Sequence, residues 1–410
     1  MRLHARPILS AMLRNWTGPV LVAARIAITL AVLINAVYIV KQRVDRIGRP
    51  TGIDVENIFV IRSVGIDEKY AHEAAMRADL AYLRGVAGVV AAAPISSPPL
   101  TGRGDRIGVM LKFDDHGHSV VTHYYEVDDQ ALAALGVRLA AGRFFYSNEV
   151  LPPRRTSGEV VGAPVAVITQ ALANDLFPDG HALGKTIFDS FGFLAAPATI
   201  VGIIDHMHGS RVSWDKFDRI LMAPRLPFPD EPAVNYLVRT QPGRRDSVML
   251  AVDEHMQSSN PDRMIEWTRT LTYLKNLSYI ADRNMGIFLV AITLMLIAIT
   301  CIGVYGLATF NVGTRAKQIG TRRALGAQRQ DIVRYFLIEN WLITTVGVII
   351  GSALALAAGS WLSTHYGLPR LDLYYLVGGI PMLWIVGQLA AWLPARRAAS
   401  VSPAVATRTV

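Results

Sequence analysis

The sequence has little charge and almost no cysteine. Of its 410 residues, 18% are charged and 51% are hydrophobic, which is more apolar and less charged than an ordinary globular protein. The single cysteine, Cys301, lies inside an apolar segment. An intrachain disulfide is therefore impossible, and a disulfide-stapled secreted fold is excluded. The composition points instead to a membrane protein.

Acidic residues are also in deficit, because 41 Lys and Arg face 32 Asp and Glu and give a formal net charge of +9. A basic protein that binds nucleic acid gathers its cations into one soluble patch interleaved with aromatic residues. Here the cations cluster beside apolar runs instead. That pattern sets the topology of membrane proteins. We therefore expect membrane lipids and no nucleic acid as partners.

Four apolar segments are long enough to cross a bilayer, since about 20 helical residues span a hydrocarbon core of about 30 Å. We predict transmembrane helices over residues 20–40, 285–310, 341–361 and 374–392. Only the first holds a charged residue, Arg25, which can snorkel towards lipid headgroups. The lack of ionisable residues in the other three argues against an ion-coupled carrier and places the energy source elsewhere.

Positive residues concentrate in the connection 311–340 and predict that this connection is cytoplasmic. They are Arg315, Lys317, Arg322, Arg323, Arg329 and Arg334. Counting spans from there places residues 1–19 and 393–410 in the cytoplasm. Residues 41–284 and the short loop 362–373 are then external.

Two features at the N-terminal end bear on this topology. The four cations between Lys41 and Arg49 lie on the predicted external side, but long loops translocate largely regardless of charge. The basic start and apolar run also resemble a secretory signal. Because the run is long and no small-residue cleavage site follows it, we expect a retained anchor.

The external region 41–284 is predicted to be mixed α/β. Expected strands are residues 57–63, 86–92, 119–127, 165–168, 198–204 and 235–239; expected helices are 67–84, 128–135, 170–176, 246–257 and one from 271 into the second span. We expect one lobe built from both ends of this region. Residues 128–228, approximately, form a second lobe inserted in it.

One motif resembles part of a phosphate-binding loop. Gly184, Lys185 and Thr186 follow each other as at the end of a P-loop, but Asp179 occupies the place of the required first glycine. We therefore interpret the motif as a turn that leads into a strand. Neither GxSxG nor a reactive cysteine beside an external histidine is present, so no catalytic residue is assigned.

Histidine clusters are the remaining candidates for chemistry. One cluster is Asp205, His206 and His208; the other is Asp114, Asp115, His116, His118 and His123. Alternate residues on a strand or loop do not by themselves give a four-ligand metal site. We interpret both clusters as solvated loops, and expect neither a metal nor a cofactor in this chain.

The third predicted span contains a GxxxG pair, Gly347 and Gly351. Small residues at this spacing allow a second helix to approach closely. Glycine is also simply frequent in membrane helices. The sequence leaves both interpretations open.

Residues 315–340 read RAKQIGTRRALGAQRQDIVRYFLIEN, which resembles the FtsX-like permease domain of the macrolide-exporter (MacB) family of ABC transporters. The chain departs from the family at Gln318, where glutamate is commoner. Residues 125–149, which begin YEVDDQALAALGVRLAAGRFF, resemble the family's periplasmic core domain. The stretch PARRAASVSPAVA, residues 394–406, resembles its C-terminal tail. The resemblance therefore extends over almost the whole chain.

The resemblance implies a permease of the bacterial inner membrane that works as a homo- or heterodimer with cytoplasmic ATPase subunits, which bind the ATP, and with a periplasmic adaptor as a further potential partner. It also implies a short ATPase-coupling helix in the cytoplasmic connection. The residues assigned to coupling are Arg315, Ile319, Gly320, Arg322, Arg323, Ala324, Leu325, Gly326 and Ala327.

From the residues themselves, a helix over 319–325 would offer Ile319, Ala324 and Leu325 to a hydrophobic socket and two arginines to acidic partners. The expected function is export driven by mechanotransmission from the ATPase to the external domain. The alternative is an FtsX-like regulator of a periplasmic partner such as a cell-wall hydrolase.

Overall fold

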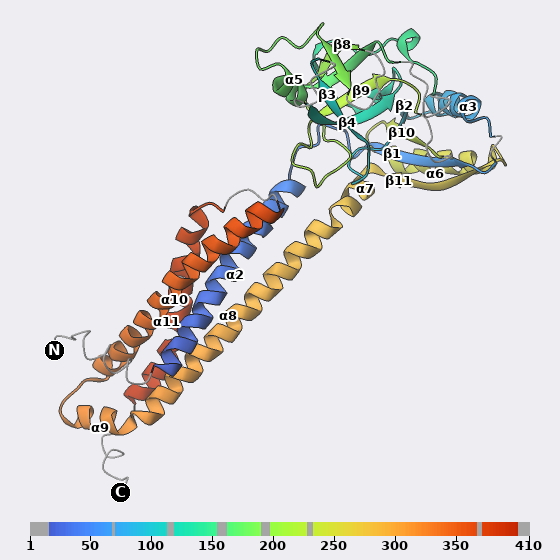
Figure 1. The fold of residues 1–410 in the computed structure, drawn as a ribbon. Helices are drawn as coiled ribbons and strands as arrows, with labels where there is room; N and C mark the ends of the chain where they lie inside the picture. Colours follow the sequence, from blue (N-terminus) through green and yellow to red (C-terminus); the bar gives the residue numbers. More distant parts are fainter. Residues whose placement is uncertain are drawn as a thin grey trace. The chain divides into compact units, whose positions relative to one another are not determined.

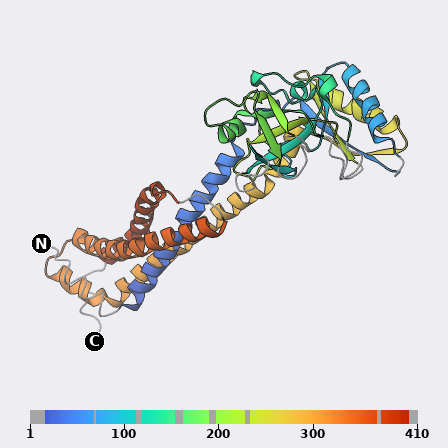
Figure 2. The same ribbon diagram turned by 45° about the horizontal axis from the view of Figure 1, so that its top comes forward.

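A computed structural model describes residues 16–67, 70–112, 119–153, 162–189, 197–227, 233–366 and 371–400. The chain forms two compact units. One is helical and consists of Met1–Asp45 with Asp282–Val410, and the other is Arg46–Ala281. Figures 1 and 2 show the helices of the first unit and the strands of the second in two orientations.

The helical unit contains four long apolar helices: α2 (Thr17–Ile47), α8 (Ile280–Thr314), α10 (Arg329–Tyr366) and α11 (Tyr374–Ala399). Each is long and apolar enough to cross a membrane, and each contains one predicted span. Their buried side chains form one apolar core drawn from all four helices. The helix α10 begins at Arg329, well inside the predicted loop 311–340, because its first turns also carry apolar residues that pack.

Glycines let α10 lie close against α2. A Cβ atom at Gly347 would lie 2.8 Å from the carbonyl oxygen of Ala23, and one at Gly351 would lie 2.8 Å from that of Ala27. Both contacts involve backbone atoms, which cannot move aside as a flexible side chain can. The small-residue spacing thus serves a close helix contact within the chain.

Several polar groups of the spans lie at the contact between α2 and α8. The guanidinium of Arg25 lies against Gly303 of α8, so this residue faces a neighbouring helix. The hydroxyls of Thr29 and Thr300 are 2.8 Å apart and share a hydrogen bond. Space at Gly303 thus allows a large polar side chain between two apolar helices.

In the described residues, the second unit is built on a sheet of eleven strands. They are β1 (Ile58–Gly65), β2 (Val89–Ile95), β3 (Arg106–Met110), β4 (Val120–Val127), β5 (Leu139–Gly142), β6 (Val165–Thr169), β7 (Thr186–Asp189), β8 (Ala198–Ile204), β9 (Ile220–Pro224), β10 (Ala233–Thr240) and β11 (Arg263–Thr270). The strand order is β11-β1-β10-β2-β4-β3-β7-β8-β6-β9, with β5 beside β8.

The pairings divide this sheet into two parts. Strands β11, β1, β10 and β2 form an antiparallel sheet. Because β9 also pairs with β4 in parallel, the strands β4-β3-β7-β8-β6-β9 close into a ring. Only the pair Ile95 and Val127 joins β2 to β4. The ring includes β3 and β4, which precede residue 128, where the second lobe was expected to begin. The division into two lobes stays a prediction.

Short helices cover both parts of the sheet. They are α3 (His72–Gly85), α4 (Ala131–Leu135), η1 (Ser147–Glu149), α5 (Gln170–Leu176), α6 (Arg245–Ser258) and α7 (Leu271–Ser278). Apolar residues of α3 and α6 pack on β1, β2 and β10, whereas α5 packs on the ring. The expected continuous helix from 271 is interrupted at Tyr279, where α7 ends and α8 begins one residue later.

The four cations that follow the first span all have acidic partners. Lys41 lies 2.5 Å from Asp45, Arg43 pairs with Asp282, and Arg46 and Arg49 each lie 3.6 Å from Asp215. Local neutralisation lowers the net positive charge of this segment. The basic stretch can lie on the predicted external side because the long region that follows it translocates largely regardless of charge.

Candidate coupling site between helices α8 and α10

The connection between α8 and α10 holds a short helix, α9 (Ala316–Ala324). It lies at the end of the helical unit where α8 ends and α10 begins (Figure 1). The sequence predicted a helix over 319–325, and the structure starts it three residues earlier. All nine residues assigned to coupling lie in α9 or directly beside it.

The stretch RRALGA forms the end of this helix. Gly326 has φ +96°, in the left-handed region. Its N–H donates to the carbonyl of Arg323 at 3.1 Å, and the N–H of Ala327 donates to that of Arg322 at 3.0 Å. These two bonds define a Schellman motif, in which glycine at the left-handed position carries no Cβ penalty. The motif is therefore a defined stop for α9.

The next helix begins with its own cap. The carboxylate of Asp331, in the first turn of α10, accepts a hydrogen bond from the N–H of Gln328 at 3.1 Å. This is the N3 half of a capping box, and the negative charge also suits the positive end of the helix dipole. The chain thus turns between two capped helix ends, so the turn has a fixed shape.

The inward face of α9 packs against its own chain. Ile319 is 5% exposed and belongs to one apolar cluster with Ile332 and Phe336 of α10 and with Ala395 and Ala398 of α11. The expectation that Ile319 enters a partner's hydrophobic socket is therefore wrong for this structure. The side chain instead anchors α9 to α10 and α11.

An ion pair ties the start of α9 to α10. The guanidinium of Arg315 lies 2.8 Å from the carboxylate of Glu339. The Glu339 side chain is 4% exposed, and that of Arg315 is 22% exposed. Both residues belong to the motif that carries the family resemblance, and here their contact is with each other.

The outward face of α9 is polar except at its C-terminal end. Arg322 is exposed, and its guanidinium lies 5.1 Å from the ring centre of Tyr335. This cation–π contact restrains the arginine side chain. Ala324 is exposed, and Leu325 is 83% exposed. Gln318 is also exposed. A charge and an apolar side chain are therefore presented together by a rigid turn.

The sequence alone predicted only in part which residues of this motif are exposed and which contact their own chain. It placed Arg322, Ala324 and Leu325 on an accessible surface, where they lie. It missed Tyr335, although an aromatic residue in the first turns of the following helix was a visible signal. It also missed the groove between α10 and α11, because residues of one helix and those of another have no fixed spacing in sequence.

The other candidate chemistry lies in the strand unit. Lys185 donates its N–H to the carbonyl of Ala182 at 3.2 Å, and β7 begins at Thr186, which confirms a turn that leads into a strand. Asp114, Asp115, His116 and His118 lie outside the described residues. Within the described ranges, no three His, Cys, Asp or Glu side chains are placed to hold a metal ion.

Two histidines that were predicted to lie in solvated loops are buried in the structure. His123 and His208 are buried, at 0% exposure each. The hydroxyl of Ser210 lies 3.4 Å from Nδ1 of His123, and Nδ1 of His208 lies 2.9 Å from the carbonyl oxygen of Gly209. Desolvation by burial lowers the pKa of His123 to about 3 and that of His208 to about 4. Both imidazoles are therefore neutral parts of the domain core.

Family models match most of the chain. The MacB-like periplasmic core domain matches residues 24–258, and the FtsX-like permease C-terminal domain matches residues 290–403. The chain belongs to the MacB/FtsX-like family of ABC transporter permeases. As in that family, a MacB-like domain lies between the first and second of four membrane helices, so the protein is a multi-pass membrane protein.

Relatives within this family include transporters and permeases. The macrolide export ATP-binding/permease protein MacB of Neisseria meningitidis serogroup A is 26% identical over 301 residues, which are 68% of this chain and 42% of the relative. The uncharacterized ABC transporter permease YknZ of Bacillus subtilis is 23% identical over 69% of this chain and 68% of its own length. The chain thus spans less than half the length of the MacB relative.

Two solved structures are similar to part of this chain. The periplasmic region of MacB from Actinobacillus actinomycetemcomitans covers 55% of this chain at 14% identity, with a TM-score of 0.35. The extracellular domain of YknZ from Gram-positive bacteria covers 51% of it at 14% identity, with a TM-score of 0.31.

Proposed function

We propose that this chain is the permease subunit of a MacB-type ABC exporter and that a separate cytoplasmic ATPase drives it through α9. The observation that carries the proposal is the outward face of α9. Arg322 offers a charge and Leu325 an apolar side chain that is 83% exposed, both held by a capped turn. Acidic residues around a hydrophobic socket would match this face.

The inward face of α9 supports a mechanical role. Ile319 packs against α10 and α11, and Arg315 pairs with Glu339 of α10. A force on α9 is therefore passed to packed helices, since packed elements move together more easily than they deform. The two connections to the strand unit are also helical, because α2 continues to Ile47 and α8 starts at Ile280.

In this proposal ATP binds only to the partner subunit, and two permease chains, identical or paralogous, share a pair of ATPases. Residues 311–328 and both chain termini face the cytoplasm, and the strand unit faces the periplasm across the inner membrane. Its movement would expel a periplasmic compound with the help of an adaptor. Relatives described as macrolide export and pyoverdine export proteins favour export over the regulatory alternative.

The test is retention of the ATPase subunit by variants of α9. Leu325→Asp and Arg322→Ala should each reduce co-purification of the ATPase at least tenfold, because about 1.4 kcal/mol of contact energy corresponds to that factor. Lys317→Gln is the matched control, since Lys317 is exposed on the same helix and lies outside the proposed contact. It should retain the ATPase like the wild type.

The proposal also predicts the behaviour of the complex after reconstitution into vesicles. Where a variant still binds the ATPase, hydrolysis should continue while substrate export falls. If the wild-type chain carries no ATPase, or if Leu325→Asp holds it as tightly as Lys317→Gln does, the proposed coupling face is wrong.

A further inference from the structure

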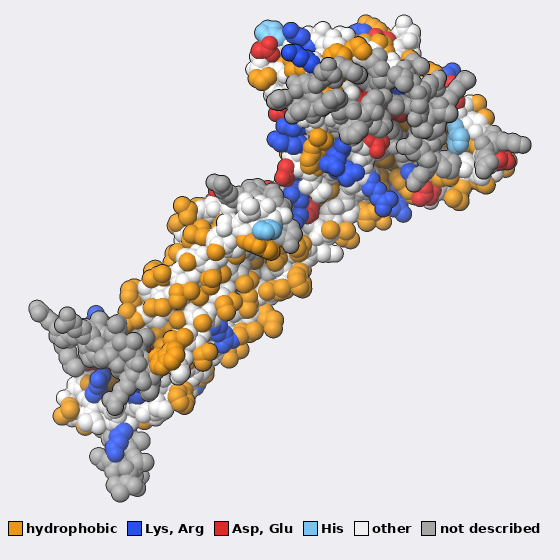
Figure 3. All heavy atoms as spheres, viewed as in Figure 1, with side chains coloured by type: hydrophobic (Ala, Val, Ile, Leu, Met, Phe, Trp, Pro, Cys, Tyr) orange, Lys and Arg blue, Asp and Glu red, His pale blue; other side chains and the backbone are white. Residues whose placement is uncertain are grey.

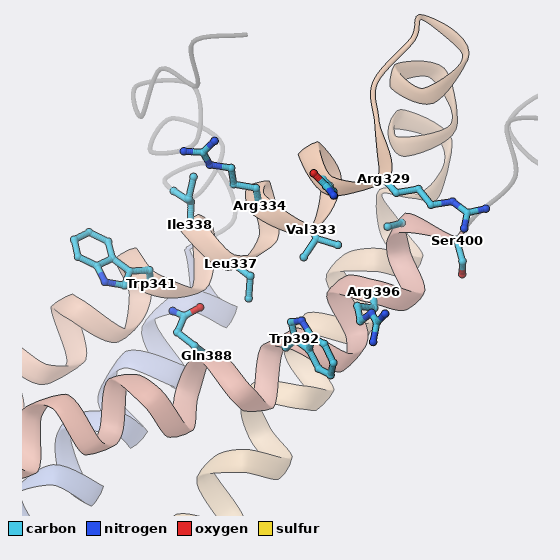
Figure 4. Close-up of a pocket in the computed structure, with 12 residues that line it drawn as sticks. Arg329, Val333, Arg334, Leu337, Ile338, Trp341, Gln388, Trp392, Arg396 and Ser400 are labelled. Carbon is cyan, nitrogen blue, oxygen red and sulfur yellow. The ribbon is translucent and has the colours of Figure 1, made fainter.

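A groove of about 690 Å³ lies between α10 and α11, near the end of the helical unit that carries α9. Its volume is within the roughly 300–1,000 Å³ typical of ligand sites. Figure 4 shows Leu337 of α10 opposite Gln388 and Trp392 of α11, with Trp341 towards one end and Arg329 beside Ser400 at the other. The lining therefore changes from apolar and aromatic to basic along the groove.

The lining of the groove has an excess of positive charge. Arg329, Arg334 and Arg396 line the groove together with no Asp or Glu among the described residues. Arg396 lies 4.6 Å from the ring centre of Trp392, and the described part of the chain contains no acidic partner for the other two arginines. Asp331, the acidic residue between Arg329 and Arg334 in sequence, already accepts a hydrogen bond from the N–H of Gln328. The uncompensated positive charge of these arginines therefore favours the binding of an anion in the groove.

A buried donor inside the groove has no acceptor. Nε2 of Gln388 is inaccessible to solvent, and no atom of the described residues accepts a hydrogen bond from it. A buried amide without a partner costs about 1–3 kcal/mol, so an acceptor supplied by a ligand would be favourable. Gln388 lies between Trp341 and Arg396 along the groove (Figure 4).

The two tryptophans indicate which kind of anion fits. Trp341 and Trp392 are 46% and 42% exposed. Figure 3 shows that hydrophobic side chains cover much of the visible surface of the long helices. Tryptophan favours the boundary between acyl chains and headgroups. A free phosphate would use the arginines but leave the apolar half of the groove empty. A lipid would fill both halves.

We propose that this groove is a binding site for an anionic glycerophospholipid of the surrounding leaflet. Its phosphate lies among the arginines, an ester oxygen accepts from Gln388, and an acyl chain lies along Leu337 and Trp341. Basic pockets between membrane helices recognise acidic headgroups in this way. The inference needs only membrane insertion of these helices and is independent of the proposed ATPase contact.

The test uses the full-length chain in nanodiscs of phosphatidylcholine with increasing fractions of phosphatidylglycerol brominated on its acyl chains. Bromine quenches a nearby indole, so Trp392 reports occupancy of the groove, and Trp392→Phe identifies its share of the signal. Quenching should saturate at a phosphatidylglycerol fraction several-fold below that needed with brominated phosphatidylcholine. Millimolar glycerol 3-phosphate should leave the quenching unchanged.

Charge-matched variants separate this site from general attraction to an acidic membrane. The double variant Arg329→Gln with Arg396→Gln should weaken the preference for phosphatidylglycerol over phosphatidylcholine by about fivefold for each arginine removed. Lys317→Gln with Arg397→Gln removes the same charge from residues outside the groove and should keep it. Gln388→Leu should weaken binding while the thermal midpoint shows that the protein remains folded.

Three results would overturn the proposal. They are equal quenching by the two brominated lipids in the wild type, equal losses in both double variants, and displacement of the lipid signal by glycerol 3-phosphate. Loss of ATPase binding in the α9 variants has no bearing on these readouts, so the two proposals fail separately.

Discussion

At the scale of single residues, the pair of Arg315 and Glu339 shows how burial assigns a role that charge alone does not. A sequence shows an arginine in a basic loop and a glutamate at the start of a span, and each could face a partner. In the structure they face each other. Glu339 is the more buried of the two, so it depends on the pair more strongly.

This asymmetry gives a prediction. Arg315→Gln should lower the stability of the helical unit by about 3 kcal/mol, because it leaves a buried carboxylate without its partner. Glu339→Gln should cost about 1 kcal/mol, since the 22% exposed guanidinium can reach water. Thermal unfolding of the detergent-purified protein measures both changes. An equal loss in the two variants would contradict this account of the pair.

His123 gives a prediction about pH. Burial, then the charges of His208, Arg106 and Arg211, lower its pKa to about 3. Unfolding restores a pKa near 6.5, so the unfolded chain binds an extra proton between about pH 3 and pH 6.5. The stabilisation is thus complete above pH 6.5 and is lost as the pH falls, by about 1.4 kcal/mol per pH unit.

Thermal midpoints between pH 4.5 and 7.5 test this dependence. His123→Gln removes one titrating group and should make the loss of stability on acidification smaller than in the wild type. His181→Gln, at an exposed site, is the control and should keep the wild-type slope. Burial raises the pKa of Asp128 to about 6, which gives an opposite slope, but this contribution is common to all three proteins and cancels.

At the scale of elements, the glycines differ in the structural reason for which a glycine is present. A Cβ at Gly347 or Gly351 of α10 would press on the backbone of α2, whereas one at Gly378 of α11 meets nothing within 4 Å. Gly326 is needed for its left-handed backbone instead. Sequence spacing alone cannot tell these glycines apart, because the deciding atoms come from another helix or from the turn.

Alanine substitution should distinguish the three helical glycines. Gly347→Ala and Gly351→Ala should each destabilise the helical unit by about 1–3 kcal/mol, because the added methyl group forces two backbones apart. Gly378→Ala should be neutral or slightly stabilising, since alanine favours the helix more than glycine does. Unfolding in detergent measures the three changes, and a loss at Gly378 as large as at Gly347 would refute the packing explanation.

At the scale of the whole molecule, both ends of the chain belong to the helical unit, and the residues between them form the other unit, with eleven strands among its described residues. The ring β4-β3-β7-β8-β6-β9 closes through a parallel pair between β4 and β9, which lie far apart in sequence. This closure joins β3 and β4 to the later strands β6, β7, β8 and β9. The proposed topology places the strand unit on the periplasmic side of the membrane and α9 on the cytoplasmic side.

Cysteine labelling tests this topology in a Cys301→Ser background. Leu325→Cys should react with a membrane-impermeant maleimide only after the inner membrane is permeabilised. Leu250→Cys, which replaces a 72% exposed residue of α6, should react in spheroplasts without permeabilisation. Both cysteines reacting on the same side would reject the proposed topology.

The apolar runs and the arginine-rich connection were sufficient to predict four spanning helices, since a bilayer demands about 20 apolar residues whatever the fold. Most strands and helices of the other unit were also visible as local patterns. Strands β3, β5, β9 and β11 were not predicted, and β7 was predicted only as the strand that follows the turn at Lys185. Three of the missed strands have only four or five residues, too few to show a period, and β11 is mostly polar.

Within the candidate site, local sequence was sufficient for the short helix and for the exposure of Arg322 and Leu325. Only the tertiary structure decided that Ile319 faces inward, that Arg315 pairs with Glu339, and that α10 and α11 enclose a basic groove. The physical reason is that a helix face or an ion pair is defined by its neighbours. Those neighbours come from segments whose distance along the chain carries no information about their distance in space.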